Sequence, residues 1–235
     1  MCRIITLFVL CCSLSSLLHA AQAASHNQPE TLSPYSAEYT ASYNGLPISM
    51  VRTLAATDEG FSLSTKASNL LGAITEEETL TLNNGQIHPQ HYQYQRAIMG
   101  KKRRETSTFD PDAQKIVNIY KDETVELAYN PQTLSPLSYQ FQMQLDLLHG
   151  KTVLNYPVAS RGHIKNYQYS IIREETIDTP LGQLDTVVVE RQRDSDERET
   201  FLWLAPKLQF LPVKLLQNEE GETYKMQIKS YTLQE

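Results

Sequence analysis

The chain has 235 residues, 40% of them hydrophobic and 20% charged, and its 27 acidic and 21 basic side chains give a net charge of −6. A single domain of this length buries enough surface to hold a core without disulfides or metal ions. The excess of acidic groups excludes nucleic acid as a general partner, because binding to phosphates needs a basic surface.

Residues 1–23 have the three parts of a cleavable secretory signal peptide. One positive charge lies in Met1-Cys2-Arg3, an uncharged and largely apolar run extends from Ile4 to Leu18, and Ala21-Gln22-Ala23 supplies small residues at the cleavage site. As a helix, the apolar run would be about 22 Å long, whereas the hydrocarbon core of a bilayer is about 30 Å thick. We therefore predict a signal peptide that is removed, and no transmembrane span.

All three cysteines, Cys2, Cys11 and Cys12, fall inside this predicted signal. The processed chain would therefore contain no disulfide, no thiolate metal site and no cysteine nucleophile. A lipoprotein signal needs a small residue before the modified cysteine, but Leu10 precedes Cys11 and a second cysteine precedes Cys12. We predict a periplasmic protein that is not a lipoprotein, with a net charge of −7 because the signal carries Arg3 and no acid.

The processed chain divides into a short leader and one domain. Residues 24–34 are small and polar and include two prolines, which predicts a flexible leader. Residues 35–235 are predicted to form a single β-rich domain. Its first strand, Tyr35 to Tyr43, alternates Tyr or Ala on one face with mostly polar residues on the other, and Asn44-Gly45 is typical of a hairpin turn.

The same two-residue alternation continues along most of the domain. It predicts further strands at residues 48–57, 61–67, 74–82, 90–96, 101–109, 116–120, 124–129, 152–156, 164–176, 184–193, 199–204, 211–217 and 223–233. Short turns between consecutive strands indicate an antiparallel meander, and a sheet this long has to curl. The predicted fold class is mainly β, with a strongly curved antiparallel sheet that forms a barrel, a half-barrel or a sandwich.

One segment departs from this pattern and predicts a helix. Its large apolar residues recur at spacings of three and four: Leu134, Leu137, Phe141, Leu145 and Leu148. Ser135 suits the N-cap, Pro136 the first helical position and Gly150 the C-terminal cap. We predict one α-helix over residues 136–149 that packs its apolar stripe against the sheet.

Three motifs in the last third of the chain follow one another in a fixed order. They are Thr179-Pro180-Leu181-Gly182 before a valine-rich strand, Trp203-Leu204-Ala205-Pro206, and Phe210-Leu211-Pro212-Val213-Lys214. Together with the tyrosine-rich first strand, they resemble the bacterial exported family catalogued as domain of unknown function 3108, over roughly Tyr35 to Leu233. The resemblance implies an exported β-rich domain without established activity, and it supplies no catalytic residues. Ala205 and Lys207 depart from the Ser and Asp of the family's tryptophan motif.

The sequence predicts no catalytic residue, no cofactor and no metal site. His88 and His91 are three residues apart in an extended stretch, which places them on opposite faces of a strand, and zinc would need further ligands. Glycine-framed serine and phosphate-loop motifs are absent. A Ser-His-Asp triad assembled only by the fold remains an open alternative.

Three charged runs allow two interpretations each. Glu76-Glu77-Glu78 and Asp194 to Glu199 favour solvated edges and turns, although paired carboxylates can also hydrolyse glycosides. Lys101-Lys102-Arg103-Arg104 favours a charged strand start that discourages edge-to-edge aggregation. The alternative for this basic run is contact with an anionic lipid headgroup or a phosphorylated glycan.

Aromatic side chains on the predicted strands and helix are the candidate ligand-binding residues. The candidates for the lining of a cavity are Tyr39, Tyr94, Phe141, Tyr167, Tyr169 and Trp203. The alternative is that these rings fill the core. We predict a non-enzymatic periplasmic binding or envelope-associated module for an apolar or amphipathic ligand or an envelope protein partner. The rival hypothesis is an envelope hydrolase that acts on a glycan or ester through dispersed acidic residues or a hidden triad. The oligomeric state stays open.

Overall fold

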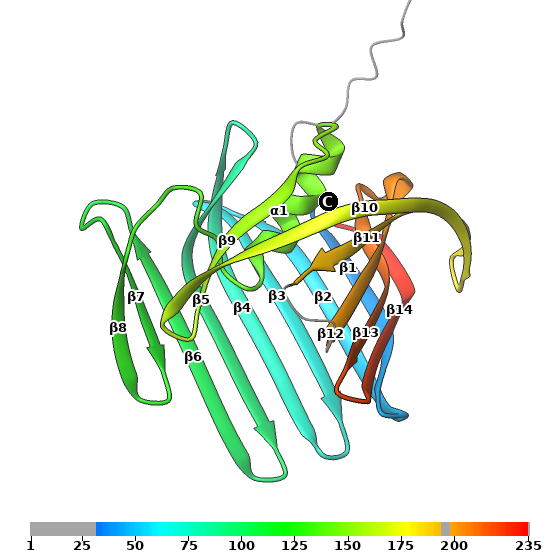
Figure 1. The fold of residues 1–235 in the computed structure, drawn as a ribbon, viewed down its shortest axis with the longest axis horizontal. Coiled ribbons are helices and arrows are strands. Elements are labelled where there is room, and N and C mark those ends of the chain that lie inside the picture. The colour runs from blue at the N-terminus through cyan, green and yellow to red at the C-terminus, as the bar shows by residue number, and fades with distance from the viewer. Residues whose placement is uncertain (1–31, 194–197, 235) are drawn as a thin grey trace, which may run out of the picture.

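The computed structural model describes residues 32–193 and 198–234, so the predicted signal and residues 24–31 of the predicted leader lie outside the described residues. The strands form one antiparallel sheet of 14 strands in the order β8-β7-β6-β5-β4-β3-β2-β1-β14-β13-β12-β11-β10-β9 (Figure 1). The elements are β1 (Tyr35–Tyr43), β2 (Leu46–Thr57), β3 (Gly60–Asn69), β4 (Gly72–Asn83), β5 (Gln86–Ile98), β6 (Lys101–Asp110), β7 (Lys115–Tyr120), β8 (Glu123–Ala128), α1 (Ser138–Leu148), β9 (Leu154–Ser160), β10 (His163–Thr179), β11 (Gly182–Gln192), β12 (Arg198–Ala205), a 3-10 turn η1 (Pro206–Leu208), β13 (Leu211–Glu219) and β14 (Glu222–Leu233).

The predicted fold class is confirmed. The described chain is mainly β with one α-helix, and its sheet is strongly curved but not closed, since β8 and β9 are its two edges. Neighbours in the sheet are neighbours in sequence except where β1 pairs with β14. That pairing joins the first and last strands of the domain.

The gap between β8 and β9 is bridged by a few hydrogen bonds rather than by a strand ladder. Leu134, in the segment between β8 and α1, makes two backbone hydrogen bonds to β9, with N···O distances of 2.8 and 2.9 Å. Glu105 Oε1 accepts a hydrogen bond from the backbone N–H of Arg161 at 2.7 Å, and Asn118 Oδ1 accepts one from that of Gly162 at 2.6 Å. The β9–β10 turn is therefore docked onto the inner face of β6 and β7.

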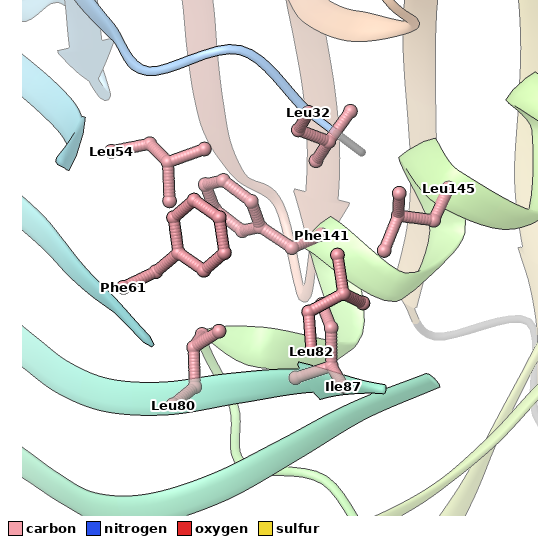
Figure 2. A pocket seen from close by; sticks show the side chains of 8 residues that line it. All are labelled: Leu32, Leu54, Phe61, Leu80, Leu82, Ile87, Phe141 and Leu145. Carbon is pink, nitrogen blue, oxygen red and sulfur yellow. The ribbon is translucent and has the colours of Figure 1, made fainter. Parts of the chain in front are cut away.

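The helix α1 lies inside the curve of the sheet and covers an apolar core at one end. Phe141 and Leu145 of the helix face a cluster of strand side chains (Figure 2). The other members of this cluster are Leu32, Leu54, Phe61, Leu80, Leu82 and Ile87. Leu32 is buried here and Ser33 N donates to Gln209 Oε1 at 2.9 Å, so the leader predicted to reach residue 34 packs from Leu32 onward. Burial of these apolar side chains away from water stabilises the folded protein.

The helix is shorter than predicted because its first two expected residues form a capping turn. Ser135 Oγ accepts hydrogen bonds from the backbone N–H groups of Leu137 and Ser138, each at 3.0 Å. These bonds satisfy N–H groups that have no partner within the helix. Gly150 closes the other end with a φ of +75° and an N–H bond to Leu147 O at 3.0 Å.

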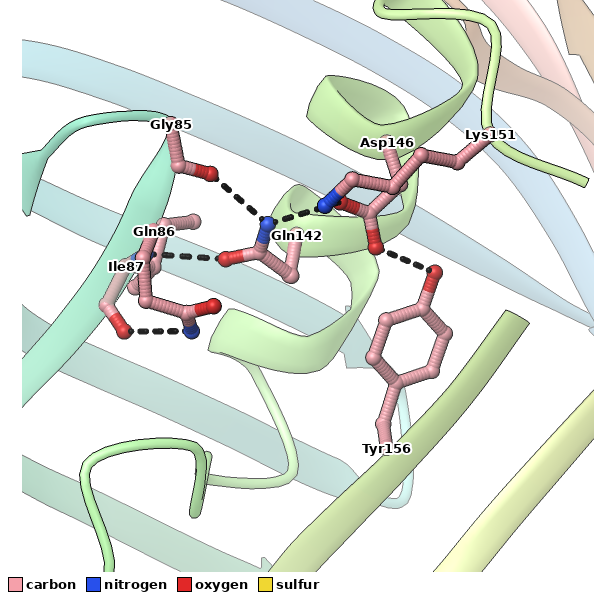
Figure 3. Close-up of polar contacts among 7 residues, drawn as sticks. All are labelled: Gly85, Gln86, Ile87, Gln142, Asp146, Lys151 and Tyr156. Carbon is pink, nitrogen blue, oxygen red and sulfur yellow. Dashed lines mark hydrogen bonds and ion pairs between the residues drawn. The ribbon is translucent and has the colours of Figure 1, made fainter. Parts of the chain in front are cut away.

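A buried polar network fastens α1 to the strands on both sides of it (Figure 3). Gln142 Oε1 accepts from the backbone N–H of Ile87 at 2.8 Å, and Gln142 Nε2 donates to Asp146 Oδ1 at 3.0 Å. Asp146 also accepts from Tyr156 Oη at 3.1 Å and from Lys151 Nζ at 2.7 Å. The network fixes the distance of the helix from β5 and β9.

Replacing Asp146 with alanine is expected to lower the free energy of unfolding by about 1–3 kcal/mol, because Tyr156 and Gln142 would keep buried donors without an acceptor. Denaturant unfolding followed by circular dichroism measures the change. Asp112→Ala, an exposed acid in the β6–β7 turn, is the control and should shift stability by less than about 0.5 kcal/mol. Equal stabilities of the two variants would contradict the role of this network.

Candidate functional site

The interior of the curved sheet that α1 leaves uncovered contains two adjoining cavities. One has a volume of about 410 Å³ and the other of about 290 Å³. Glu76 and Tyr94 line both, so the two cavities share a wall, and we call the pair the chamber. The larger volume exceeds the lower end, about 300 Å³, of ordinary ligand pockets.

One side of the chamber is strongly basic. Five of the 13 residues that line the larger cavity are Arg or Lys, against the two carboxylates Glu76 and Glu105. We call these five the cationic wall: Arg161, Lys165, Arg191, Arg193 and Arg198. Within the described chain, Arg198 pairs with Glu219 at 3.2 Å and the other four take part in no ion pair. A protein of net negative charge thus gathers positive charge around one cavity, with Arg161 and Lys165 exposed and Arg191, Arg193 and Arg198 half-buried.

Strand pairing and an aromatic ring hold Arg191 in place. Arg191 on β11 is paired in register with Tyr169 on β10, so Tyr167 is its diagonal neighbour on the same face. The Arg191 guanidinium lies over the Tyr167 ring, with Cζ 3.4 Å from the ring centroid. Cation–π contact of this kind fixes the guanidinium plane while leaving its N–H groups free to bind.

The crowding of positive charge is visible at Arg193. Its Nη1 donates to the backbone oxygen of Arg198 at 3.0 Å and to Thr200 Oγ1 at 3.2 Å. Burial lowers the pKa of Arg193, and the charges of Arg191 and Arg198 lower it further. An anion bound between these groups would offset the lowering of this pKa, because a nearby opposite charge favours the charged form of arginine.

Two of the three carboxylates in the run Glu76-Glu77-Glu78 face inward, contrary to the expectation of a solvated acidic run. Only Glu77 is exposed, and it pairs with Lys66 at 3.6 Å. Glu76 accepts a hydrogen bond from Tyr92 Oη at 2.8 Å, and burial raises its pKa. Glu78 is 2% exposed and accepts a hydrogen bond from a serine hydroxyl. The solvated interpretation is wrong for Glu76 and Glu78, because strand alternation turns them toward hydroxyl donors inside the sheet.

The second cavity supplies an apolar wall. Its apolar lining comes from several strands of the sheet: Ile48, Met50, Ala67, Ala73, Ile74, Ile98 and Tyr224. Glu76 and Tyr94 mark the boundary between this wall and the cationic one. The chamber therefore has the polarity of an amphipathic molecule, charged on one side and apolar on the other.

The structure separates the six aromatic residues that the sequence nominated as a cavity lining. Tyr94 and Tyr167 both line the larger cavity. Tyr169 is buried, lines neither cavity and shares a hydrogen bond with Tyr139, with the two hydroxyl oxygens 3.2 Å apart. The remaining three lie elsewhere: Tyr39 and Phe141 in the core around α1, and Trp203 on β12.

Trp203 contacts charged side chains outside the chamber lining. Its ring lies 4.2 Å from Lys214 Nζ and 5.9 Å from Arg173 Cζ, measured to the ring centroid, and its Nε1 donates to Glu175. It lines neither cavity of the chamber. A role for Trp203 in ligand binding stays a prediction without support from this geometry.

The sequence does not nominate the cationic wall, although it carries a signal for two of the five residues. Val187, Val189 and Arg191 alternate along β11, and Arg193 directly after the strand continues the alternation, so that two valines are followed by two arginines. A strand face that changes from apolar to basic indicates a change from core to cavity. Arg161 and Lys165 lie on another hairpin, and only the fold brings them to the same wall.

Other site classes find no support in the described residues. No group of three or more His, Asp or Glu side chains there is placed to hold a metal ion. The hydrogen bonds of His91 and His163 in the described ranges go to Thr108 Oγ1 and to the Arg161 carbonyl oxygen, and none joins a histidine to a serine. None of the helices in residues 32–193 and 198–234 is long and apolar enough to cross a membrane.

The comparisons with known proteins describe a family and a fold. The family model described as "Protein of unknown function (DUF3108)" matches residues 38–229. A crystal structure of a "Beta-barrel-like Protein of Domain of Unknown Function DUF1849 from Brucella abortus" is similar to this chain, with a TM-score of 0.59 and 9% identity over 87% of this chain and 99% of that chain. At this identity the likeness concerns the fold alone. A search of the curated proteins gives no match.

Proposed function

This chain belongs to the DUF3108 family, whose model spans most of its length, and we propose that it is an exported protein that binds an amphipathic anionic ligand in the chamber. The observation that carries the proposal is the cationic wall beside an apolar wall inside one cavity system. Guanidinium groups bind phosphate and carboxylate through paired hydrogen bonds. The apolar wall would take the hydrocarbon part of the same molecule, since burial of that surface is favourable.

Export is proposed from the N-terminal sequence. The charged start, apolar run and small-residue site of residues 1–23 support a cleaved signal and a periplasmic location. A processed chain without cysteines is compatible with an oxidising compartment. Intact-mass measurement of protein recovered from cells tests this part, since retention of residues 1–23 would contradict it.

Replacing Arg191 with alanine is expected to weaken binding of dodecyl phosphate about tenfold or more, because a charge-assisted hydrogen bond contributes about 1.5–3 kcal/mol. Isothermal titration calorimetry measures the affinity. Arg191→Lys keeps the charge but loses the planar donor pair, so its loss should be smaller. Lys225→Ala, an exposed cation outside the chamber lining, is the control and should bind as the unmodified protein does.

Two further ligands separate the parts of the proposal. Dodecyl maltoside has the same chain without charge, and inorganic phosphate has charge without a chain. Both should bind more weakly than dodecyl phosphate, because each uses only one wall of the chamber. Equal binding of dodecyl phosphate and dodecyl maltoside would remove the anionic ligand from the proposal, and unchanged affinity in Arg191→Ala would remove the site.

The rival function, an envelope hydrolase, has one specific observation in its favour. Glu76 lines the chamber with a raised pKa and a hydroxyl donor, which are features of a general acid. Glu105, which lines the same cavity, already accepts hydrogen bonds from the backbone N–H of Arg161 at 2.7 Å and from Asn118 Nδ2 at 3.1 Å. Mass spectrometry of a bound ester or glycoside distinguishes the two functions: an unchanged ligand supports binding, and a cleaved one supports hydrolysis.

A further inference from the structure

Two hairpin turns, β3–β4 and β5–β6, lie at the end of the sheet opposite α1 (Figure 1), and both expose apolar side chains. Leu70, in the β3–β4 turn, is fully exposed, and Met99, in the β5–β6 turn, is 76% exposed. Leu71 is also exposed, and the turns are adjacent because Met99 N donates to Leu71 O at 2.9 Å. Burial of a side chain of this kind contributes about 1.5–3 kcal/mol of free energy. A group of such side chains exposed at neighbouring tips therefore indicates a surface that binds a partner.

These tips are held in fixed positions. Asn69 Oδ1 accepts from the backbone N–H groups of Leu71 and Gly72, at 2.8 and 3.1 Å, which leaves Leu70 projecting from the turn. A side chain at Gly72 would collide with the carbonyl oxygen of Ala97 on β5, so the two hairpins pack backbone against backbone. The apolar tips are therefore a preformed protrusion rather than a groove.

A basic run begins directly beside the Met99 tip. Lys101, Lys102 and Arg104 are exposed, Arg103 lies over the Tyr120 ring with Cζ 5.9 Å from its centroid, and in the described chain none of the four is in an ion pair. Lys102 and Arg104 alternate on the strand, so they share one face.

We propose that this edge, made of Leu70, Leu71, Met99 and Lys101 to Arg104, docks on an anionic lipid bilayer. Apolar tips that enter the boundary between headgroups and acyl chains, with cations at headgroup depth, are the pattern of interfacial membrane binding. Charge complementarity commits the surface to anionic lipid, and a protruding tip suits a deformable bilayer better than a protein pocket. The unpaired basic run is accounted for by the same contact.

Docking at this edge brings the chamber to the membrane. Asn69, Gly72, Ala73 and Ile98, which belong to the same two hairpins, line the apolar cavity. The mouth of that cavity would then open at the depth where lipid chains begin. The docking proposal stands without the ligand proposal, but together they make the membrane the source of the chamber's ligand.

Vesicle co-sedimentation of protein recovered from the expressing cells tests the docking. Phosphatidylcholine vesicles that contain phosphatidylglycerol should bind the protein, and pure phosphatidylcholine vesicles should bind it weakly. Lys102→Ala with Arg104→Ala should weaken binding to the anionic vesicles about 25-fold, since each cation near such a surface contributes about fivefold. Leu70→Ser with Met99→Ser should weaken it about tenfold or more.

Matched controls come from the opposite end of the sheet. Val153 is 82% exposed and Lys207 is exposed, and both lie away from the docking edge, so Val153→Ser and Lys207→Ala should bind vesicles normally. Lys102→Ala with Arg104→Ala, at residues that do not line the chamber, should keep the affinity for dodecyl phosphate in solution, which separates a failure of the docking edge from a failure of the chamber. Equal binding to both kinds of vesicle, no binding to either, or capture of an acidic protein through these tips without vesicle binding would overturn the proposal.

Discussion

Replacing Phe141 with alanine is expected to lower the free energy of unfolding by about 3–5 kcal/mol, the usual range for a large aromatic side chain in a core. Phe141 is 1% exposed and stacks on Tyr35, with ring centroids 6.3 Å apart and planes inclined by 8°. Its ring also lies 5.6 Å from the guanidinium carbon of Arg52. The variant would leave a cavity in the core that the helix shares with the inner face of the sheet.

Equilibrium unfolding in urea measures this loss. Phe141→Leu keeps most of the apolar volume and should cost less than about 1.5 kcal/mol, which separates packing from any effect of the aromatic ring. A loss below about 1 kcal/mol for the alanine variant would show that the core tolerates a void there, so that α1 is held mainly by the hydrogen bonds of Asp146 and Gln142.

The stability of the protein is expected to fall as the pH rises from about 5 to 8, because of Glu78. Burial raises the pKa of Glu78 to about 8, with the charge of Glu76 adding to the effect and the hydroxyl of Ser135, 2.6 Å from Oε2, opposing it. The native state therefore keeps a proton that the unfolded chain, with an ordinary value of 4.5, releases. The stabilisation is complete below the unfolded value and is lost by up to about 1.4 kcal/mol per pH unit through this window.

Glu78→Gln should flatten this pH dependence and make the protein more stable than the unmodified one above pH 8. The glutamine keeps the shape and remains neutral, so folding no longer changes its protonation. Glu77→Gln, on the exposed face of the same strand, is the control and should leave the slope unchanged. Thermal melts across the pH range measure the slopes, and parallel curves for all three proteins would contradict a neutral buried Glu78.

Most of the fold follows from local sequence patterns. Asn44-Gly45 and Asn84-Gly85 turn the chain with positive φ at all four residues, as the hairpin dipeptides predict. The strand that begins at Tyr35 ends at Tyr43, as its alternation indicated. Ser135 and Gly150 flank the only α-helix in the described residues, because their capping chemistry is local and does not depend on the sheet.

The site was less accessible to prediction because it is assembled from distant segments. Arg161 is on one hairpin and Arg191 on the next, and their common cavity exists only after the sheet curls. The acidic run at Glu76 was misjudged for the related reason that three adjacent charges suggest solvent, whereas alternation exposes only the middle one. Amino-acid composition counts every charge of the chain but does not indicate which charges a curved sheet encloses.

The way in which the two outer strands are fastened has a mechanical consequence. All 13 ladders between neighbouring strands lie on one continuous path, and the clasp at Leu134, Glu105 and Asn118 is made of a few separate bonds. Opening that clasp breaks no ladder, so the girth of the sheet can increase while all 13 ladders stay intact, at the cost of the hydrogen bonds that buried Glu105 and Asn118 make to the β9–β10 turn. A bulkier ligand in the chamber would be accommodated by a wider separation between the edge strands β8 and β9.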